Sequence, residues 1–331
     1  MSEVRRKVTD EKRHQARDGA PARYQRPSVP GRAIFVVGPG RSGTSAITRG
    51  LQALGVELGD RLKAPTSKNP TGFFEDRDLL RISKRVRAVL GLRAESVALV
   101  RPEQWKSPQL EALRREAQAT IAGRFAGAPV WGFKYAQTLR LLPFWQPLFE
   151  SGALEVSFVV AIRNPLSVAR SRAALDALRG RQEKSDLEWL VNLVPFFRVV
   201  ARHPFVVVDY DLLMLDPAGQ LERMARALQL PLDARARVGI ASYVESFLSP
   251  SMRHTTFSDL DLEREDRLHP LARDAYRLLR RLAEGGLPDD PEAFWRDWGR
   301  IEQALADLAP LLRLVDELEG RLRRRRTWWR P

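Results

Sequence analysis

The sequence contains no cysteine, so it can form neither a disulfide bond nor a thiolate site. It has only four histidines, which argues against a metal site built from imidazole ligands. It has no run of 18 apolar residues, so we expect no transmembrane helix. Residues 1–30 are polar and charged, so we predict no apolar targeting segment there. These absences are typical of a cytoplasmic protein, which is the location that we predict.

The positive charge of the sequence is concentrated at its two ends. Of the net charge of +14, residues 1–30 contribute +4 and residues 321–331 contribute +6, from six arginines and no acid. The long central part therefore carries only +4. Because a nucleic-acid-binding domain usually carries its charge on the folded surface, we predict no nucleic-acid partner. We interpret residues 1–30, which include three prolines, as a flexible basic arm.

The stretch FVVGPGRSGTS has the spacing of a phosphate-binding loop but lacks its lysine. The P-loop pattern is G-x-x-x-x-G-K-[ST]. Gly38 and Gly43 occupy its glycine positions and Ser45 its hydroxyl position, but Thr44 stands where lysine should be. The nearest cation is Arg41. Because that lysine meets the β- and γ-phosphates in ATP and GTP sites, its loss indicates a shorter anion, bound without a metal.

Apolar runs alternate with helical patterns along most of the chain. Continuous apolar runs predict buried parallel strands at 33–38, 129–135, 154–163 and 204–211. Helical patterns occupy roughly 76–90, 108–124, 165–178, 186–202 and 216–229, and one more begins directly after the loop. This alternation predicts an α/β fold of the three-layer P-loop-like kind over residues 31–290, with a central parallel sheet flanked by helices.

A different pattern fills residues 291–331. Apolar side chains recur there alternately four and three positions apart: Phe294, Trp298, Ile301, Leu305, Leu308, Leu312 and Val315. This heptad stripe predicts a C-terminal amphipathic helix, which Pro310 should kink. Two uses of the stripe stay open, since it could pack on its own domain or pair with a second copy in a homodimer.

A second stretch, FVVAIRNPLSVARS, indicates a second anion site. Arg163 ends an apolar strand, and Asn164 with Pro165 opens a helix. Ser171 lies eight residues beyond Arg163, which is about two helical turns. The serine hydroxyl can therefore face the strand end, where it and Arg163 can jointly bind a second phosphate.

With these two stretches, the sequence resembles the sulfotransferases that use 3′-phosphoadenosine-5′-phosphosulfate (PAPS), in particular bacterial carbohydrate-type members. RSGTS matches their first motif, and Arg163 with Ser171 matches their second. The resemblance implies that the first motif holds the 5′-phosphosulfate and the second the 3′-phosphate, with PAP as product and no metal. SPSMRHT, at 249–255, resembles a late basic segment that closes over the nucleotide. The implied nucleotide-binding residues are Gly40, Arg41, Ser42, Gly43, Thr44, Ser45, Arg163, Ser171 and Arg253.

Two more stretches supply candidates for catalysis. NPTGFFED resembles a segment in which relatives place an acidic residue, so we predict Glu75 as general base and Asp76 as second choice. The alternative for either acid is a charge that faces a helix N-terminus. WGFKYAQ keeps Lys134, although Tyr-Ala-Gln replaces the Asp-Pro-Arg of relatives, with an effect that stays open. We predict that Lys134 and Arg41 stabilise the leaving phosphate oxygen. The alternative for Lys134 is a surface lysine.

Two other functions fit parts of the sequence. FVVVDYD imitates the metal-binding strand of a P-loop kinase, with Asp209 as the Mg²⁺ ligand. The missing loop lysine argues against this function. A non-catalytic nucleotide-binding adaptor that assembles through its C-terminal helix is the other alternative. Glu75 and Lys134 argue against lost catalysis.

The resemblance suggests the class of acceptor, and the composition of the C-terminal end suggests a membrane attachment. The resemblance favours a hydroxyl of a glycan or lipid-linked glycan as acceptor. The end of the chain, RLRRRRTWWRP, places six arginines beside Trp328 and Trp329. Arginine is attracted to anionic lipid and tryptophan prefers the membrane–water interface. One hypothesis is therefore peripheral attachment to the inner face of the cell membrane, and the alternative is a solvated basic tail.

Overall fold

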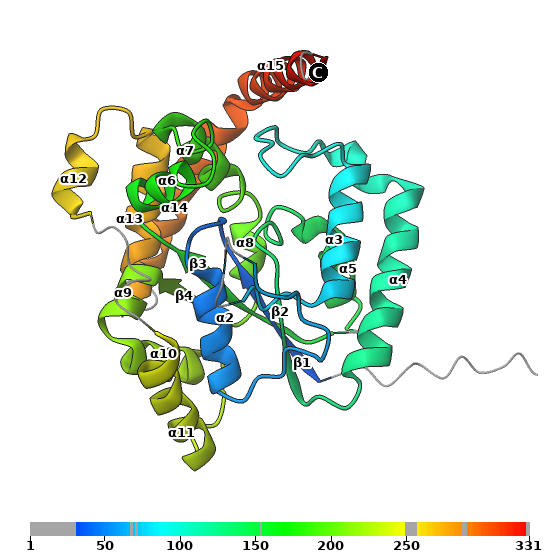
Figure 1. Cartoon of the computed structure of the whole chain (residues 1–331), viewed down its shortest axis with the longest axis vertical. Coiled ribbons are helices and arrows are strands. Elements are labelled where there is room, and N and C mark those ends of the chain that lie inside the picture. Colours follow the sequence, from blue (N-terminus) through cyan, green and yellow to red (C-terminus); the bar gives the residue numbers. More distant parts are fainter. Residues whose placement is uncertain are drawn as a thin grey trace, which may run out of the picture.

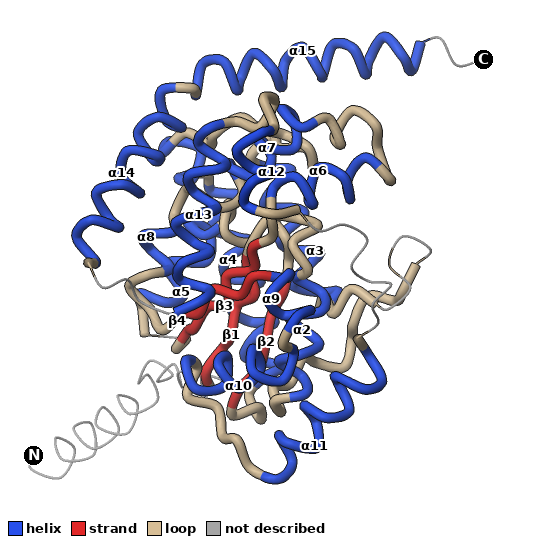
Figure 2. The backbone as a smooth tube through the Cα atoms, turned by 90° about the vertical axis from the view of Figure 1, so that its left-hand side faces the viewer, coloured by secondary structure: helices blue, strands red, loops and turns tan. Residues whose placement is uncertain are grey.

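A four-stranded, wholly parallel sheet lies at the centre of the computed structural model (Figures 1 and 2). The structure describes residues 31–66, 69, 72–152, 154–248, 257–285 and 290–328, with side chains up to Arg323. The strands are β1 (Arg32–Val37), β2 (Val130–Lys134), β3 (Val156–Ile162) and β4 (Phe205–Asp209). Their order in the sheet is β2-β1-β3-β4. The predicted α/β class and all four predicted strands are therefore confirmed.

The strands read as unbroken apolar runs because both faces of the sheet are covered. Ile34 and Val36 of β1 face one apolar core, whereas Phe35 and Val37 face the other. This alternation follows from the two-residue period of a strand. On the second face, the ring of Phe35 makes edge contacts with several other aromatic rings, Trp145 and Phe158 among them.

Helices pack on both faces and complete three layers (Figure 1). The Ile34 face is covered by α2 (Thr44–Ala53), α10 (Pro217–Ala227) and α11 (Ala234–Ser242). The Phe35 face is covered by α3 (Arg77–Val89), α4 (Pro108–Phe125), α5 (Leu142–Glu150), α13 (Pro270–Gly285) and α14 (Pro291–Asp307). Shorter elements connect these layers: η1 (Pro102–Lys106), α6 (Pro165–Ala173), α7 (Gln182–Val191), α8 (Phe197–Val200), α9 (Tyr210–Leu215), η2 (Tyr243–Phe247) and α12 (Asp259–Arg264).

Two predicted helices are wrong in extent. The helix predicted at 186–202 is interrupted, because Pro195 has no N–H to donate and disfavours helical geometry in the residue before it. Phe196, the next residue, has φ 67°. The helix predicted at 165–178 ends at Ala173. Beyond it, the Asp176 carboxylate accepts hydrogen bonds from the N–H groups of Leu178 and Arg179, which makes a turn instead.

The C-terminal stripe divides between two helices. Leu308 is the single residue between α14 and α15 (Ala309–Trp328), and Pro310 lies in the first turn of α15. The stripe residues Phe294, Trp298, Ile301 and Leu305 of α14 are buried in the core, and Leu312 of α15 is buried with them. The α14 part of the stripe therefore packs on its own chain. Figure 2 shows α15 running along one end of the molecule and continuing past it.

None of the helices in the described ranges combines the length and the apolar composition needed to cross a bilayer.

Candidate anion-binding and catalytic site

The candidate site lies where the parallel strands end. The loop 38–43 joins the end of β1 to the start of α2, and β1 lies between β2 and β3 in the sheet. Lys134 is the last residue of β2, and Arg163 follows the last residue of β3. Parallel strands place their carboxyl ends at one edge of the sheet, which is where α/β proteins build ligand sites. The two predicted anion-binding stretches therefore lie next to each other, at the carboxyl ends of neighbouring strands.

The loop backbone adopts conformations that most residues avoid. Gly38, Arg41 and Gly43 have φ of 132°, 78° and 74°. A Cβ on Gly43 would lie 2.0 Å from Cδ2 of Tyr210, so packing alone requires glycine there. At Gly40, by contrast, the nearest neighbouring atom would be the Cβ of Ala136, 3.9 Å away. The loop thus has a packed side and an open side, from which an anion can approach the backbone.

The donors of the loop suit an anion. Gly43 precedes the first residue of α2 and supplies no side-chain cap, so the first N–H groups of the helix remain available to a ligand. The buried Oγ of Ser42 has no hydrogen-bond partner among the described residues. Leaving a buried hydroxyl unpaired costs free energy. A bound phosphate or sulfate oxygen would remove that cost, so these residues fit a phosphosulfate group.

Two arginines and a serine meet beside the loop. The Nε of Arg41 donates a hydrogen bond to the Oγ of Ser171 in α6, at 2.9 Å. Partial desolvation and, next, the charge of Arg163 lower the pKa of Arg41, so the two guanidinium groups are neighbours. Arg163 is buried, with its guanidinium carbon 4.8 Å from the centre of the Tyr210 ring. Two neighbouring cations with a hydroxyl form a setting that a dianionic phosphate would stabilise.

A buried ion pair lies at the end of β2. The Nζ of Lys134 is 3.0 Å from Oε1 of Glu75 and donates to the Oγ of Ser45 at 3.3 Å. The lysine side chain is 3% exposed and that of Glu75 9%. Burial lowers the pKa of Lys134, and the Glu75 carboxylate opposes this shift. The pair therefore connects an acid from the 69–76 stretch to the anion loop, as the sequence could not show.

Two further residues hold Glu75 and the segment that carries it in place. The Nζ of Lys63 lies 3.6 Å from Oε2 of Glu75 and 3.4 Å from the centre of the Phe73 ring. The Nδ2 of Asn69 donates to the carbonyl of Gly72 and, at 3.3 Å, to the Oγ of Ser45. Both carboxylate oxygens thus face a lysine, and the segment that carries them is tied to the loop. No sequence spacing marks Lys63, because the contact depends on the path of this segment.

Asp76 has a different environment from its neighbour. It caps α3, since its Oδ1 accepts hydrogen bonds from the N–H groups of Asp78 and Leu79 at 3.0 Å. Its Oδ2 lies 2.5 Å from an Nη of Arg124, and its side chain is 1% exposed. This is the alternative that the sequence left open for the two acids, a charge at a helix N-terminus.

The Tyr-Ala-Gln stretch forms a structural network. The hydroxyl of Tyr135 donates to Oε1 of Gln137 at 2.8 Å, and Arg87 donates to both side chains. The Nε2 of Gln137 donates to the carbonyl of Ala94 at 2.9 Å. These residues therefore connect α3 and the 93–98 segment to the end of β2.

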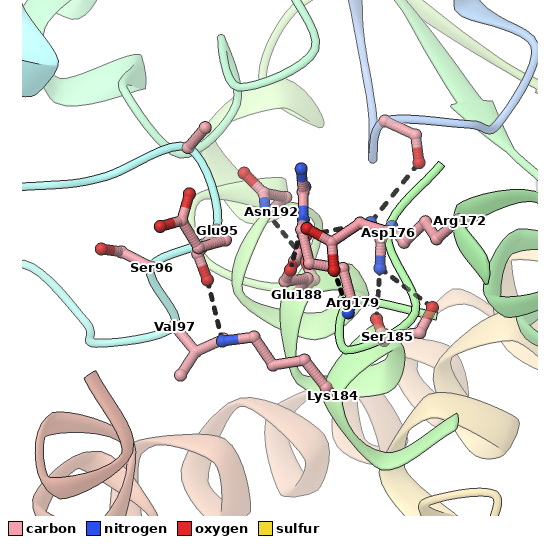
Figure 3. A network of polar contacts seen from close by, with 12 residues as sticks. Glu95, Ser96, Val97, Arg172, Asp176, Arg179, Lys184, Ser185, Glu188 and Asn192 are labelled. Atoms are coloured by element: carbon pink, nitrogen blue, oxygen red, sulfur yellow. Dashed lines mark hydrogen bonds and ion pairs between the residues drawn. The ribbon is translucent and has the colours of Figure 1, made fainter. Parts of the chain in front are cut away.

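A buried polar network supports the loop from α6 and α7 (Figure 3). Arg172 donates to the carbonyl and the hydroxyl of Ser185, at 2.6 and 3.0 Å, and more weakly to the carbonyl of Gly40 at 3.4 Å. Arg179 makes a two-pronged pair with Glu188, at 3.0 and 2.6 Å. Burial lowers the pKa of Arg172 to about 10. The network holds α6, which carries Ser171, against the loop.

Asp209 occupies a place that does not suit the metal ligand of a kinase. It ends β4, which is separated from β1 by β3. Its Oδ1 caps α9, and its Oδ2 accepts a hydrogen bond from the hydroxyl of Tyr276 at 2.9 Å. Its side chain is fully buried, and burial raises its pKa to about 6. The remaining predicted site residue, Arg253, lies outside the described residues.

No protein-family model and no curated protein matches this sequence. Solved structures are similar in fold. Sulfotransferase STF1 from Mycobacterium tuberculosis H37Rv has 17% identity, a TM-score of 0.39, and a match covering 68% of this chain and 76% of its own. The sulfotransferase domain of the Synechococcus PCC 7002 olefin synthase has 17% identity and a TM-score of 0.38, and the match covers 84% of this chain and 95% of that domain. Retinol dehydratase, solved with androsterone and the inactive cofactor PAP, has 14% identity and a TM-score of 0.32, and the match covers 86% of this chain and 82% of its own.

Proposed function

We propose that the protein transfers a sulfuryl group from PAPS to an acceptor hydroxyl. The observation that carries the proposal is the buried pair of Glu75 and Lys134, whose lysine also contacts Ser45 of the anion loop. A loop that binds an anion, a cation at its mouth and a carboxylate beside that cation are the parts that group transfer needs. The sequence resemblance supplies the identity of the transferred group.

Two parts of the site would hold the nucleotide. The N–H groups of residues 40–45, with the hydroxyls of Ser42, Thr44 and Ser45, would bind the 5′-phosphosulfate. Arg163 and Ser171 would bind the 3′-phosphate. Because Arg41 contacts Ser171 and neighbours Arg163, we assign it to the 3′-phosphate rather than to the leaving oxygen. Arg253 stays a prediction from the sequence.

The transfer would proceed by in-line displacement. The acceptor oxygen forms a bond to sulfur while the bond between sulfur and the 5′-phosphate oxygen breaks. The acceptor proton passes to Glu75, and the negative charge that develops on the departing phosphate is stabilised by Lys134 and the loop N–H groups. Lys63 would keep the Glu75 carboxylate oriented. We propose Glu75 rather than Asp76 as base, because Glu75 pairs with Lys134, which also contacts Ser45, whereas Asp76 caps α3 and pairs with Arg124.

The acceptor class and the location rest on the sequence alone. We propose a hydroxyl of a glycan or lipid-linked glycan as acceptor, as the carbohydrate-type resemblance implies. We propose a cytoplasmic reaction, in keeping with a chain that lacks cysteine.

The test measures binding and transfer separately. Calorimetry with PAP and with ATP plus Mg²⁺, each with and without EDTA, should show that PAP binds better and that EDTA has no effect on it. Transfer of label from PAPS to a panel of glycan, lipid-linked and phenolic acceptors should then give turnover. Preferred binding of ATP with Mg²⁺ would support the kinase alternative. Tight PAP binding without turnover on any acceptor class would support the adaptor.

A further inference from the structure

One face of α15 is fixed to the body by polar contacts. The carboxylate of Asp316 accepts hydrogen bonds from the N–H groups of Val97 and Ala98, at 2.8 and 3.1 Å. Glu319 pairs with Lys184 at 2.7 Å, and Arg323 pairs with Glu95 at 3.0 Å. These residues recur at three- and four-residue intervals, so they lie along one side of the helix. The helix therefore cannot rotate without breaking several ion pairs and hydrogen bonds.

A different face of α15 exposes a row of leucines. Leu311, Leu314, Leu318 and Leu322 are 59%, 48%, 47% and 60% exposed. They also recur at three- and four-residue intervals, about a third of a turn around the helix from the anchoring residues. The other large apolar side chains exposed in the described residues are scattered over separate elements, for example Leu215 on α9 and Leu260 on α12. A contiguous apolar row of this kind marks an interaction surface.

The charge around this row identifies the kind of partner. Arg321 is exposed next to the leucines, and Arg313 and Glu317 are exposed farther around the same side of the helix. The sequence from residue 321 onward adds six arginines, two tryptophans and no acid. An apolar face bordered by arginines and followed by tryptophan is the composition of helices that lie in the interface of an anionic membrane. We propose that α15 docks on an anionic lipid surface through Leu311, Leu314, Leu318 and Leu322, with the arginines on the headgroups.

A second copy of the chain fits this face less well. The exposed row spans residues 311–322, which is less than two heptads, whereas pairing helices need about three to four. Parallel pairing would also bring two clusters of six arginines together, and like charges at that distance repel. A lipid surface does not require a long apolar stripe, because it offers a large area. It also needs no acidic residues on the protein, because its headgroups supply the negative charge.

The test compares vesicle binding by matched variants of the full chain. Co-sedimentation uses vesicles of phosphatidylcholine alone or with phosphatidylglycerol. We expect binding only with phosphatidylglycerol, and weaker binding at high salt. The double variant Leu318→Gln with Leu322→Gln should have an affinity for these vesicles that is lower by roughly tenfold or more, because two apolar side chains are lost from the interface. Glutamine keeps the helix propensity, so α15 should remain helical.

The control places the same change on other exposed leucines. Leu215→Gln with Leu260→Gln should bind vesicles like the unaltered protein, and both double variants should unfold at nearly its temperature. Equal binding by the Leu318/Leu322 variant would overturn the proposal, and so would a lack of binding to anionic vesicles. Analytical ultracentrifugation tests whether a second copy of the chain covers this face instead. A dimer of the unaltered protein that is absent in the Leu318/Leu322 variant would also overturn the proposal. None of these readouts requires PAPS, so they are independent of the proposed reaction.

Discussion

Glu75 and Asp76 show how two adjacent carboxylates receive different roles from their contacts. The first faces Lys134 and Lys63 beside the anion loop, and the second caps α3 and pairs with Arg124. We predict that Glu75→Gln lowers turnover by about 10²–10⁴-fold, because a general base contributes that much. PAP affinity should stay nearly unchanged, since a base acts on the acceptor. Steady-state kinetics with PAPS, together with PAP calorimetry, measures both quantities.

The neighbouring change serves as its comparison. Asp76→Asn should act on stability, because asparagine can still cap α3 but removes the charge opposite Arg124, at a cost of about 1–3 kcal/mol. Urea unfolding measures this cost. If Asp76→Asn lost turnover at full stability while Glu75→Gln kept it, the base would be Asp76.

Arg163 and Ser171 provide a second residue-scale prediction. Arg163→Ala and Ser171→Ala should each weaken PAP binding by about 1.5–3 kcal/mol, as expected for a lost hydrogen bond to a charged group. Adenosine-5′-phosphosulfate lacks the 3′-phosphate, so its binding should change far less. Calorimetry with both ligands makes the comparison. Equal losses for the two ligands would show that the residues stabilise the fold rather than bind the phosphate.

At the scale of elements, α15 is held by contacts that a short segment far away in the sequence supplies. Asp316 accepts from the N–H groups of Val97 and Ala98, and Arg93 donates to the Asp316 carbonyl at 3.0 Å. We predict that Asp316→Ala lowers the free energy of unfolding by about 1–3 kcal/mol, because it leaves two backbone donors without a partner. Hydrogen exchange at Val97 and Ala98 should become faster, and mass spectrometry of peptides covering 93–101 can measure it.

The matched control lies on the same helix. Glu317 is exposed, so Glu317→Ala should leave both the free energy of unfolding and the exchange at 93–101 close to those of the unaltered protein. If both changes lowered the free energy of unfolding and sped up exchange to the same extent, the cause would be the loss of negative charge from the helix rather than the loss of the Asp316 contact.

At the scale of the whole molecule, buried carboxyl groups make stability depend on pH. Burial raises the pKa of Asp186 to about 7 and that of Asp209 to about 6, although Arg280 opposes the second shift. An unfolded aspartate titrates near pH 4. Between these values the folded state binds more protons than the unfolded state, so each group makes stability fall as pH rises.

Asp209→Asn tests this dependence, because asparagine resembles the protonated acid and does not titrate. The stability of the unaltered protein relative to the variant should fall as pH rises from about 4 to about 6 and then level off. Urea unfolding of both proteins at pH 4–8 measures the difference. A difference that instead rises with pH would mean that Arg280 and Tyr276 stabilise the ionised carboxylate.

The sequence by itself determined the features that depend on neighbouring residues. The apolar runs predicted all four strands of the described residues, because a strand buried on both faces is apolar at nearly every position. The spacing from Gly38 to Ser45 predicted a loop between a strand and a helix, since its backbone path is set by those few residues. The position of Pro310 marked the break between α14 and α15 for the same reason. Pro195 was an equally local signal, and it should have prevented the helix predicted over 186–202.

Tertiary structure decided which distant residues meet. Lys134 and Glu75 are 59 positions apart, and Arg41 and Ser171 are 130 positions apart. Nothing in either local sequence fixes these distances, because they depend on how the strands are ordered and how the helices pack. The same holds for the C-terminal stripe, because the sequence left open whether it packs on its own domain or pairs with a second copy. The contacts of Asp316 and Glu319 with the body hold their side of α15 inward and leave the leucine side exposed.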